Sequence, residues 1–94
     1  MSRYARRVDD NQREIVKGLM QIGCLVHDTS AAGKGFPDIV AGFRGKVHLI
    51  EIKDGGKTKS RRKLTPVQED FHRLWSGYVT VVKSLDEAIE AVTA

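Results

Sequence analysis

The first helix-like pattern of apolar residues runs from about Asn11 to Ile22. Three apolar positions recur there at helical spacing and predict one buried stripe: Ile15, Leu19 and Ile22. Asn11 with Glu14 matches a capping box at the start of this helix, and Gly23 is a suitable stop. The pattern therefore predicts a helix that lays one face against a core.

Two further helices are predicted in the second half of the chain. Thr65 is placed to cap a helix that has Pro66 at its first position and Gln68 three residues after the cap. Ser84 is placed to cap the last helix, with Glu87 completing its capping box. The predicted apolar faces consist of Val67, Phe71 and Leu74 in the first of these helices and Leu85, Ala88, Ile89 and Val92 in the second.

Four short segments between the helices have the composition of strands. They are residues 24–29, 39–43, 46–53 and 78–82. Arg44-Gly45 supplies a turn between the second and third strands, so these two should form a hairpin. The third strand has apolar residues on both faces, as a strand covered on both sides does. The order helix, three strands, helix, strand, helix predicts an α/β fold with a mixed sheet.

Length and composition suit a folded globule rather than a disordered tail. The chain has 94 residues, 40% of them hydrophobic, which favours one globular domain spanning residues 1–94. The single cysteine, Cys24, excludes a disulfide framework and a cysteine-rich zinc site. No long apolar run predicts a membrane span, and the basic start lacks the apolar stretch of a secretory signal. These features favour the cytoplasm, in a bacterial or phage-infected cell.

Positive charge is concentrated in one stretch. The formal net charge is +4, and the basic residues between positions 53 and 63 are Lys53, Lys57, Lys59, Arg61, Arg62 and Lys63. Asp54 is the only acid among them, which favours a loop that tracks nucleic-acid phosphates over a merely solvated loop. Lys34, in a glycine-rich stretch, is a further candidate phosphate contact with the same alternative.

Three charged residues occupy positions in the predicted hairpin where stability alone does not call for them. Asp38 opens one strand, and Glu51 and Lys53 lie near the end of the next. Residues two apart in a strand point to the same face, so Glu51 and Lys53 should project together. The turn at Arg44-Gly45 brings Asp38 beside Glu51.

Paired carboxylates next to a lysine suggest a metal site. Two adjacent carboxylates are costly to bury unless a cation lies between them. Oxygen ligands, with the backbone carbonyl of Ile52 as a further candidate, select Mg²⁺ or Mn²⁺ over zinc. Lys53 would orient or deprotonate an attacking water, or neutralise transition-state charge. The alternative is an ion pair between Glu51 and Lys53, with Asp38 as a loop cap.

The wider arrangement of motifs points to a family. Three blocks follow one another in the order Gly35-Phe36-Pro37-Asp38-Ile39-Val40, Leu49-Ile50-Glu51-Ile52-Lys53 and Leu64-Thr65-Pro66-Val67-Gln68. Together they resemble the PD-(D/E)XK nuclease superfamily and, within it, the VRR-NUC family in its short stand-alone form. The resemblance spans roughly Asn11 to Val92. It implies a restriction-endonuclease-like αβββαβ core with a mixed central sheet flanked by helices.

The resemblance also implies roles for single residues. Asp38 and Glu51 would be metal ligands and Lys53 the catalytic lysine. Glu14 would match the acidic residue that the family often carries on its first helix near the metal, and Gln68 the glutamine that faces the active site. Glu14 and Gln68 are equally suited to capping their helices, and we do not expect one side chain to serve both purposes.

These features lead to one main functional hypothesis and two alternatives. The main one is a Mg²⁺- or Mn²⁺-dependent DNA endonuclease that is specific for branched DNA such as four-way (Holliday) junctions in DNA repair. Paired cuts require two centres, so we expect a homodimer, which would use either the last helix or the helix with Phe71 and Trp75. The alternatives are a non-catalytic nucleic-acid-binding module that retains the fold and a small protein that binds an acidic partner.

Overall fold

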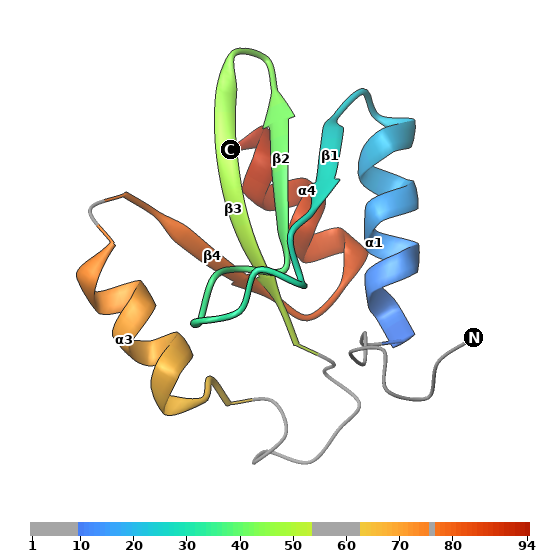
Figure 1. Ribbon diagram of the computed structural model, residues 1–94. Helices are drawn as coiled ribbons and strands as arrows, with labels where there is room; N and C mark the ends of the chain where they lie inside the picture. The colour runs from blue at the N-terminus through green and yellow to red at the C-terminus, as the bar shows by residue number, and fades with distance from the viewer. Residues whose placement is uncertain (1–9, 54–62, 76) are drawn as a thin grey trace.

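The structure, a computed structural model, describes residues 10–53, 63–75 and 77–94 (Figure 1). Its elements follow the predicted order of helices and strands. They are α1 (Asp10–Gln21), β1 (Leu25–Asp28), β2 (Ile39–Phe43), β3 (Lys46–Ile52), α3 (Pro66–Leu74), β4 (Val79–Val82) and α4 (Leu85–Thr93). No helix within these ranges is long and apolar enough to cross a bilayer.

The four strands form one sheet in the order β1-β2-β3-β4. β1 pairs with β2 and β2 with β3 in antiparallel fashion, whereas β3 and β4 run parallel. This arrangement confirms the predicted mixed sheet. Because β3 is central, its carboxyl-terminal half is flanked by β2 on one side and by β4 on the other, with Glu51 opposite Val81.

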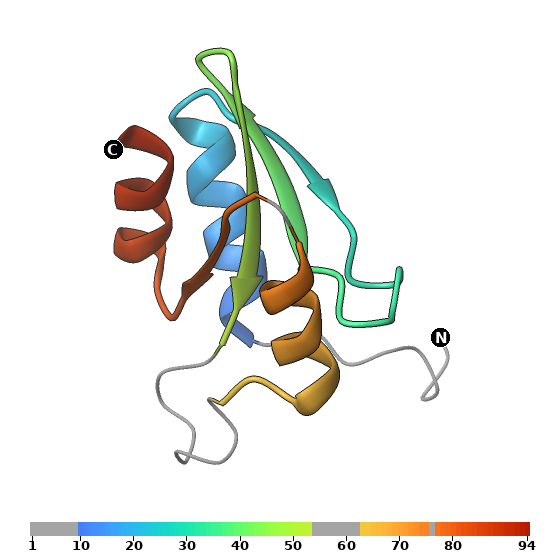
Figure 2. The ribbon, with the colours of Figure 1, turned by 90° about the vertical axis from the view of Figure 1, so that its left-hand side faces the viewer.

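The hydrophobic core lies between the sheet and the helices α1 and α4, which lie together on one side of it (Figure 2). The predicted stripe of α1 supplies Ile15 and Leu19, both fully buried. Ile22 is exposed, because α1 ends at Gln21 and Gly23, at a φ of +108°, turns the chain toward β1. From the sheet and α4 the core takes Ile39, Ala41, Phe43, Ile50, Ile52, Val82, Ala88 and Val92.

The opposite face of the sheet is covered only in part. The carboxyl-terminal half of β3 is buried on both faces, as predicted, but Val47 near its start is 74% exposed. Helix α3 is the element on this side, and none of its residues is buried. It is held by an edge-on contact of the Phe36 and Phe71 rings at 5.3 Å, and Trp75 stacks on Phe71 at 5.0 Å. The predicted apolar face of α3 is therefore partly open to solvent.

Two of the three predicted helix starts are confirmed. Thr65 and Gln68 form the predicted capping box with Pro66 in the first turn, and the Ser84 side chain accepts from the backbone N–H of Glu87. The carboxylate of Glu87 accepts from Lys83 N at 2.7 Å, one residue before the cap, so the Ser84 cap forms but Glu87 does not complete the predicted capping box.

The predicted cap at Asn11 is wrong. Helix α1 begins one residue earlier, at Asp10, so Asn11 lies within its first turn. The Asn11 side chain donates to the backbone carbonyls of Lys53 and Lys83 instead. A long-range contact with two strand ends has replaced the local hydrogen bond that the sequence suggested.

The loop before β2 approaches α3 closely at Gly35. A Cβ at this position would lie 2.5 Å from the carbonyl oxygen of Val67, and Gly35 has a φ of +81°. We expect Gly35→Ala to lower the free energy of unfolding by about 2–4 kcal/mol, because both overpacking and a left-handed backbone conformation oppose the added methyl group. Urea unfolding followed by the fluorescence of Trp75 measures this change.

Gly33 provides the matched control for this substitution. It has a similar φ of +74°, but a Cβ there meets nothing within 4 Å. Gly33→Ala should therefore show the backbone cost alone, about 1 kcal/mol. Equal losses for the two variants would mean that the loop does not press against α3.

Candidate active site

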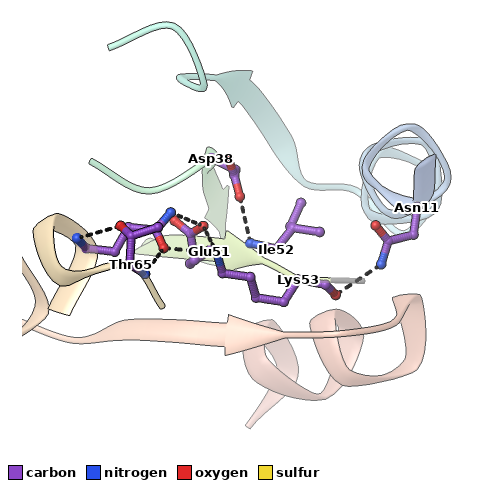
Figure 3. A network of polar contacts seen from close by, with 7 residues as sticks. Asn11, Asp38, Glu51, Ile52, Lys53 and Thr65 are labelled. Carbon is purple, nitrogen blue, oxygen red and sulfur yellow. Dashed lines mark hydrogen bonds and ion pairs between the residues drawn. The ribbon is translucent and has the colours of Figure 1, made fainter. Parts of the chain in front are cut away.

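Asp38 directly precedes β2 and is fixed by contacts of both its side chain and its backbone. Its carboxylate oxygen Oδ2 accepts a hydrogen bond from the backbone N–H of Ile52 at 2.8 Å (Figure 3). Its backbone carbonyl accepts from Thr29 N, also at 2.8 Å. The Thr29 hydroxyl donates to the carbonyl of the buried Pro37 at 2.7 Å. Asp38 is thus tied to the central strand β3 at the residue after Glu51.

Glu51 and Lys53 project to the face of β3 that lies opposite the hydrophobic core. This follows from the alternation along the strand, because Ile50 and Ile52 point into the core. Glu51 is only 2% exposed, and its Oε2 atom lies 3.6 Å from Nζ of Lys53. The predicted projection of both side chains to one side is confirmed, and Lys53 too is buried.

Gln68 connects these residues to helix α3. Its Oε1 accepts from Lys53 Nζ at 2.9 Å and from the backbone N–H of Thr65 at 2.9 Å, while its Nε2 donates to Glu51 Oε2 at 2.8 Å. The two donors on one side and the carboxylate on the other fix the orientation of the amide. We expected Gln68 to cap its helix or to contact the site; the structure shows one side chain in contact with both.

Burial and, next in size, the charge of Asp38 together raise the pKa of Glu51 to about 8, although the charge of Lys53 acts in the opposite direction. The Glu51 side chain is therefore mainly protonated at neutral pH when no cation is bound. Burial and the charge of Lys53 lower the pKa of His72, which lies one turn after Gln68 on α3. The site holds two carboxyl groups that repel each other whenever both are ionised.

The donor atoms fit a hard divalent cation. Oε1 of Glu51 is buried and has no hydrogen-bond partner within the described residues, an arrangement that normally costs free energy. A cation between Glu51 and Asp38 would satisfy this oxygen and remove the repulsion between the carboxylates. The backbone of Ile52 lies beside Asp38, where its carbonyl is a candidate third ligand. Such an all-oxygen set suits Mg²⁺ or Mn²⁺ better than zinc.

The other predicted site residues lie away from this cluster or outside the described ranges. Glu14 is exposed, and no group of three or more His, Cys, Asp or Glu side chains suited to a metal occurs among residues 10–53, 63–75 and 77–94. Lys34 and Lys63 are exposed. The remaining basic candidates, Lys57, Lys59, Arg61 and Arg62, lie outside the described residues.

The sequence-based prediction overlooked one polar residue on the buried side of α1. Gln12 is only 3% exposed, and it precedes Ile15 by three residues on the same stripe as Leu19. The helix therefore directs Gln12, rather than Glu14, toward the interior. The helical spacing places Gln12 on the same face as Ile15 and could have indicated its burial. The prediction did not use this signal, because only apolar residues were counted in the buried stripe.

Comparison with known proteins places this geometry in a family context. A family model described as "Archaeal holliday junction resolvase (hjc)" matches residues 3–74. A solved structure described as a VRR_NUC domain is similar in fold, with a TM-score of 0.63 and 24% identity, over 90% of this chain and 97% of the other. A search of curated proteins found no match.

The raised pKa of Glu51 predicts a pH-dependent stability of the metal-free protein. Between the ordinary pKa of 4.5 and the folded value of about 8, the native state holds a proton that the unfolded state has lost. The free energy of unfolding should therefore fall as pH rises through this range, with a slope of up to about 1.4 kcal/mol per pH unit from this group. Urea unfolding in a chelating buffer at several pH values measures the slope.

The contribution of Glu51 is isolated by subtraction. Glu51→Gln should remove this slope, whereas Glu90→Gln, an equivalent change on the exposed side of α4, should keep it. The lowered pKa values of His48 and His72 act with the opposite sign and are common to all three proteins. An identical slope in Glu51→Gln and the unsubstituted protein would contradict the assignment.

Proposed function

This chain belongs to the archaeal Holliday junction resolvase (Hjc) family of PD-(D/E)XK nucleases, and on that premise we propose that it is a divalent-metal-dependent DNA endonuclease that cleaves branched DNA, with four-way junctions as its preferred substrate. Family membership confirms the predicted nuclease superfamily, and the structural match confirms the restriction-endonuclease-like fold. The observation that carries the metal dependence is the pair of Asp38 and Glu51, with one buried oxygen lacking a partner, beside Lys53.

In the proposed site, Asp38, Glu51 and the carbonyl of Ile52 hold Mg²⁺ or Mn²⁺. Such a cation, when bound, lowers the pKa of a coordinated water and withdraws charge from a phosphate oxygen. Glu14 is not included in the proposed ligand set, because it is exposed and apart from the two carboxylates. Nucleases of this family generally use divalent metals, which supports the proposal.

Lys53 acts on the reacting phosphate and water. Its ammonium group lies 3.6 Å from Glu51 and donates to Gln68, so it is held at the edge of the carboxylate pair. From there it can orient the attacking water or neutralise charge that develops on the phosphate oxygens. Gln68 contacts both the Lys53 ammonium and the Glu51 carboxylate and holds them in a fixed relative position, which makes it a positioning residue in this scheme.

DNA binding would rely on positively charged side chains. We propose that the basic residues of the 53–63 stretch contact phosphates, together with Lys34 in the exposed loop between β1 and β2. These residues are Lys57, Lys59, Arg61, Arg62 and Lys63. Such contacts would strengthen binding to DNA of any sequence and weaken as salt rises. Selection of branched over linear DNA would then depend on the relative arrangement of two active sites in a dimer.

Isosteric substitutions of the proposed ligands test the function. Asp38→Asn and Glu51→Gln should each lower the rate of junction cleavage with Mg²⁺ or Mn²⁺ by on the order of a hundredfold or more, since each removes a ligand charge. Binding of the junction in chelating buffer should change little. Cleavage of labelled four-way and linear DNA, with and without metal, provides both measurements.

Glu90→Gln is the matched control and should cleave at the wild-type rate. A protein that binds junctions but never cleaves them, with any divalent ion, would support the non-catalytic binding module instead. Near-wild-type cleavage by Glu51→Gln, in a preparation free of contaminating nuclease, would contradict the ligand assignment.

We further propose that the protein is a homodimer, because paired cuts at a symmetric junction require two centres at a fixed separation. Of the two predicted interfaces, the last helix is occupied by the core, where Ala88 and Val92 are buried. The region around α3 and β4 has apolar surface to spare. Its exposed members are Leu74, Trp75, Tyr78 and Val81, of which Leu74 is 70% and Tyr78 is 94% exposed. An exposed group of this kind supports an interface there.

Light scattering tests the dimer. We expect about twice the chain mass of 10.5 kDa at micromolar concentration. Leu74→Glu should shift the mass toward that of the monomer, because it places a charge in the proposed interface. Leu25→Glu, at an exposed position on the far edge strand β1, should leave the dimer intact. A monodisperse monomer that still makes paired, symmetric cuts would contradict the proposal.

A further inference from the structure

We propose that Asn11 is a positioning residue for Lys53: its side-chain amide ties the first turn of α1 to the ends of β3 and β4 and thereby holds the lysine in place beside Glu51. The inference rests on the proposed function in one respect only, that Lys53 acts on the substrate. Helix α1 would thus contribute to the site through Asn11, whereas the sequence had suggested Glu14 as the contributing residue of this helix.

A single nitrogen atom makes both connections. Asn11 Nδ2 donates to the carbonyl of Lys53 at 3.3 Å and to the carbonyl of Lys83 at 3.0 Å. The first of these bonds is visible in Figure 3. A primary amide carries two N–H groups, so both are used by these two acceptors. The partners are 42 and 72 positions away in sequence, so one side chain joins three distant segments.

The connection lies where the parallel strands end. The backbone N–H of Lys53 donates to Val82 O at 2.9 Å, continuing the pairing of β3 with β4 one residue past β3. The first carbonyls past the ends of β3 and β4 are those of Lys53 and Lys83, and the Asn11 amide donates to both of them. Strand ends fray when their hydrogen-bonding groups lack partners, and Asn11 supplies partners to both ends at once.

The other end of the Asn11 side chain shows that the donor contacts determine its orientation. Its oxygen Oδ1 is buried and has no hydrogen-bond partner among residues 10–53, 63–75 and 77–94. A buried acceptor without a donor is rare and costly. The amide is nevertheless turned so that its nitrogen meets the two carbonyls. A carboxylate of the same size would offer no donor there and would repel both carbonyl oxygens.

These contacts fix the backbone from which the Lys53 side chain extends. The ammonium group is held by Gln68 and lies close to Glu51, but a lysine has four flexible methylene groups between Nζ and the backbone. A displacement of about 1 Å at a catalytic group costs up to on the order of a hundredfold in rate. Loss of the Asn11 contacts should therefore impair turnover through Lys53, and leave DNA affinity almost unchanged.

Two substitutions of Asn11 and one control test this role. Asn11→Ala removes both hydrogen bonds, and Asn11→Asp keeps the volume but removes the donors. Each should lower the single-turnover cleavage rate at saturating protein by about tenfold or more, a fraction of the cost of a 1 Å displacement, with DNA affinity unchanged. Gln21→Ala, at the exposed end of α1, should cleave at the wild-type rate. Wild-type turnover in both Asn11 variants would overturn the proposal.

A double-mutant cycle distinguishes positioning of Lys53 from a general structural effect. In a Lys53→Ala background, whose slow residual cleavage is followed at high protein concentration, adding Asn11→Ala should cost little further rate, because the group that Asn11 positions is already absent. The same fold loss in both backgrounds would overturn the proposal. If Asn11→Ala does not fold, the cycle is run with Asn11→Asp, whose charge in the first turn favours the helix.

Hydrogen exchange separates failure of this inference from failure of the proposed function. If the unsubstituted protein cleaves no DNA under any metal condition, the proposed function is wrong, but the effect of the Asn11 hydrogen bonds on the ends of β3 and β4 can still be measured. Backbone amides in residues 49–53 and 79–83 should exchange faster in Asn11→Asp than in the unsubstituted protein, while residues 39–43 keep their protection. Unchanged exchange rates at the ends of both strands would overturn the proposed role of Asn11, whatever the outcome of the cleavage assays.

Discussion

Two carboxyl groups lie close together, one on the central strand β3 and one directly before its neighbour β2, and they impose the main physical constraint on this molecule. Glu51 is buried on β3, and Asp38 accepts a hydrogen bond from the next residue of that strand, Ile52. The electrostatic free energy of the two carboxyl groups therefore depends on whether a proton or a cation lies between them. A proton relieves part of the repulsion, and a divalent cation would relieve more of it. The surrounding polar groups are arranged around this pair, with a lysine and a glutamine on one side and a backbone N–H on the other.

The fold separates stability from this constraint by placing them on opposite faces of the sheet. One face carries the apolar core beneath α1 and α4, with Ile50 and Ile52 pointing into it. The other carries Glu51 and Lys53 and is covered only in part by α3, which buries none of its own residues. Adjacent residues of β3 thus alternate between core and site. The polar side can change its protonation or bind a cation while the apolar side keeps its packing.

Local sequence patterns were sufficient to predict most of the fold, because helices and strands have distinct periods and the caps at Thr65 and Ser84 are formed by near neighbours. The projection of Glu51 and Lys53 to one face of the sheet followed from strand alternation alone. Asn11 was misassigned because its actual partners are the carbonyls of Lys53 and Lys83, far away in sequence. A spacing rule detects a partner three residues away, but it carries no information about one that tertiary structure supplies. The degree of exposure of Leu74 could not be predicted for a related reason, since an apolar stripe does not indicate how much of it the fold covers.

The double role of Gln68 narrows the choice of residue at that position. At the third position of a capped helix, glutamate and glutamine serve almost equally well, because either can accept from the backbone N–H of the cap. Here the amide nitrogen also faces the carboxylate of Glu51, and a glutamate would add a third negative group to a pair that already repels. The start of α3 and the charge balance of the site therefore cannot drift independently during evolution. A chain that exchanged this glutamine for glutamate would keep its helix and alter the electrostatics on which its chemistry depends.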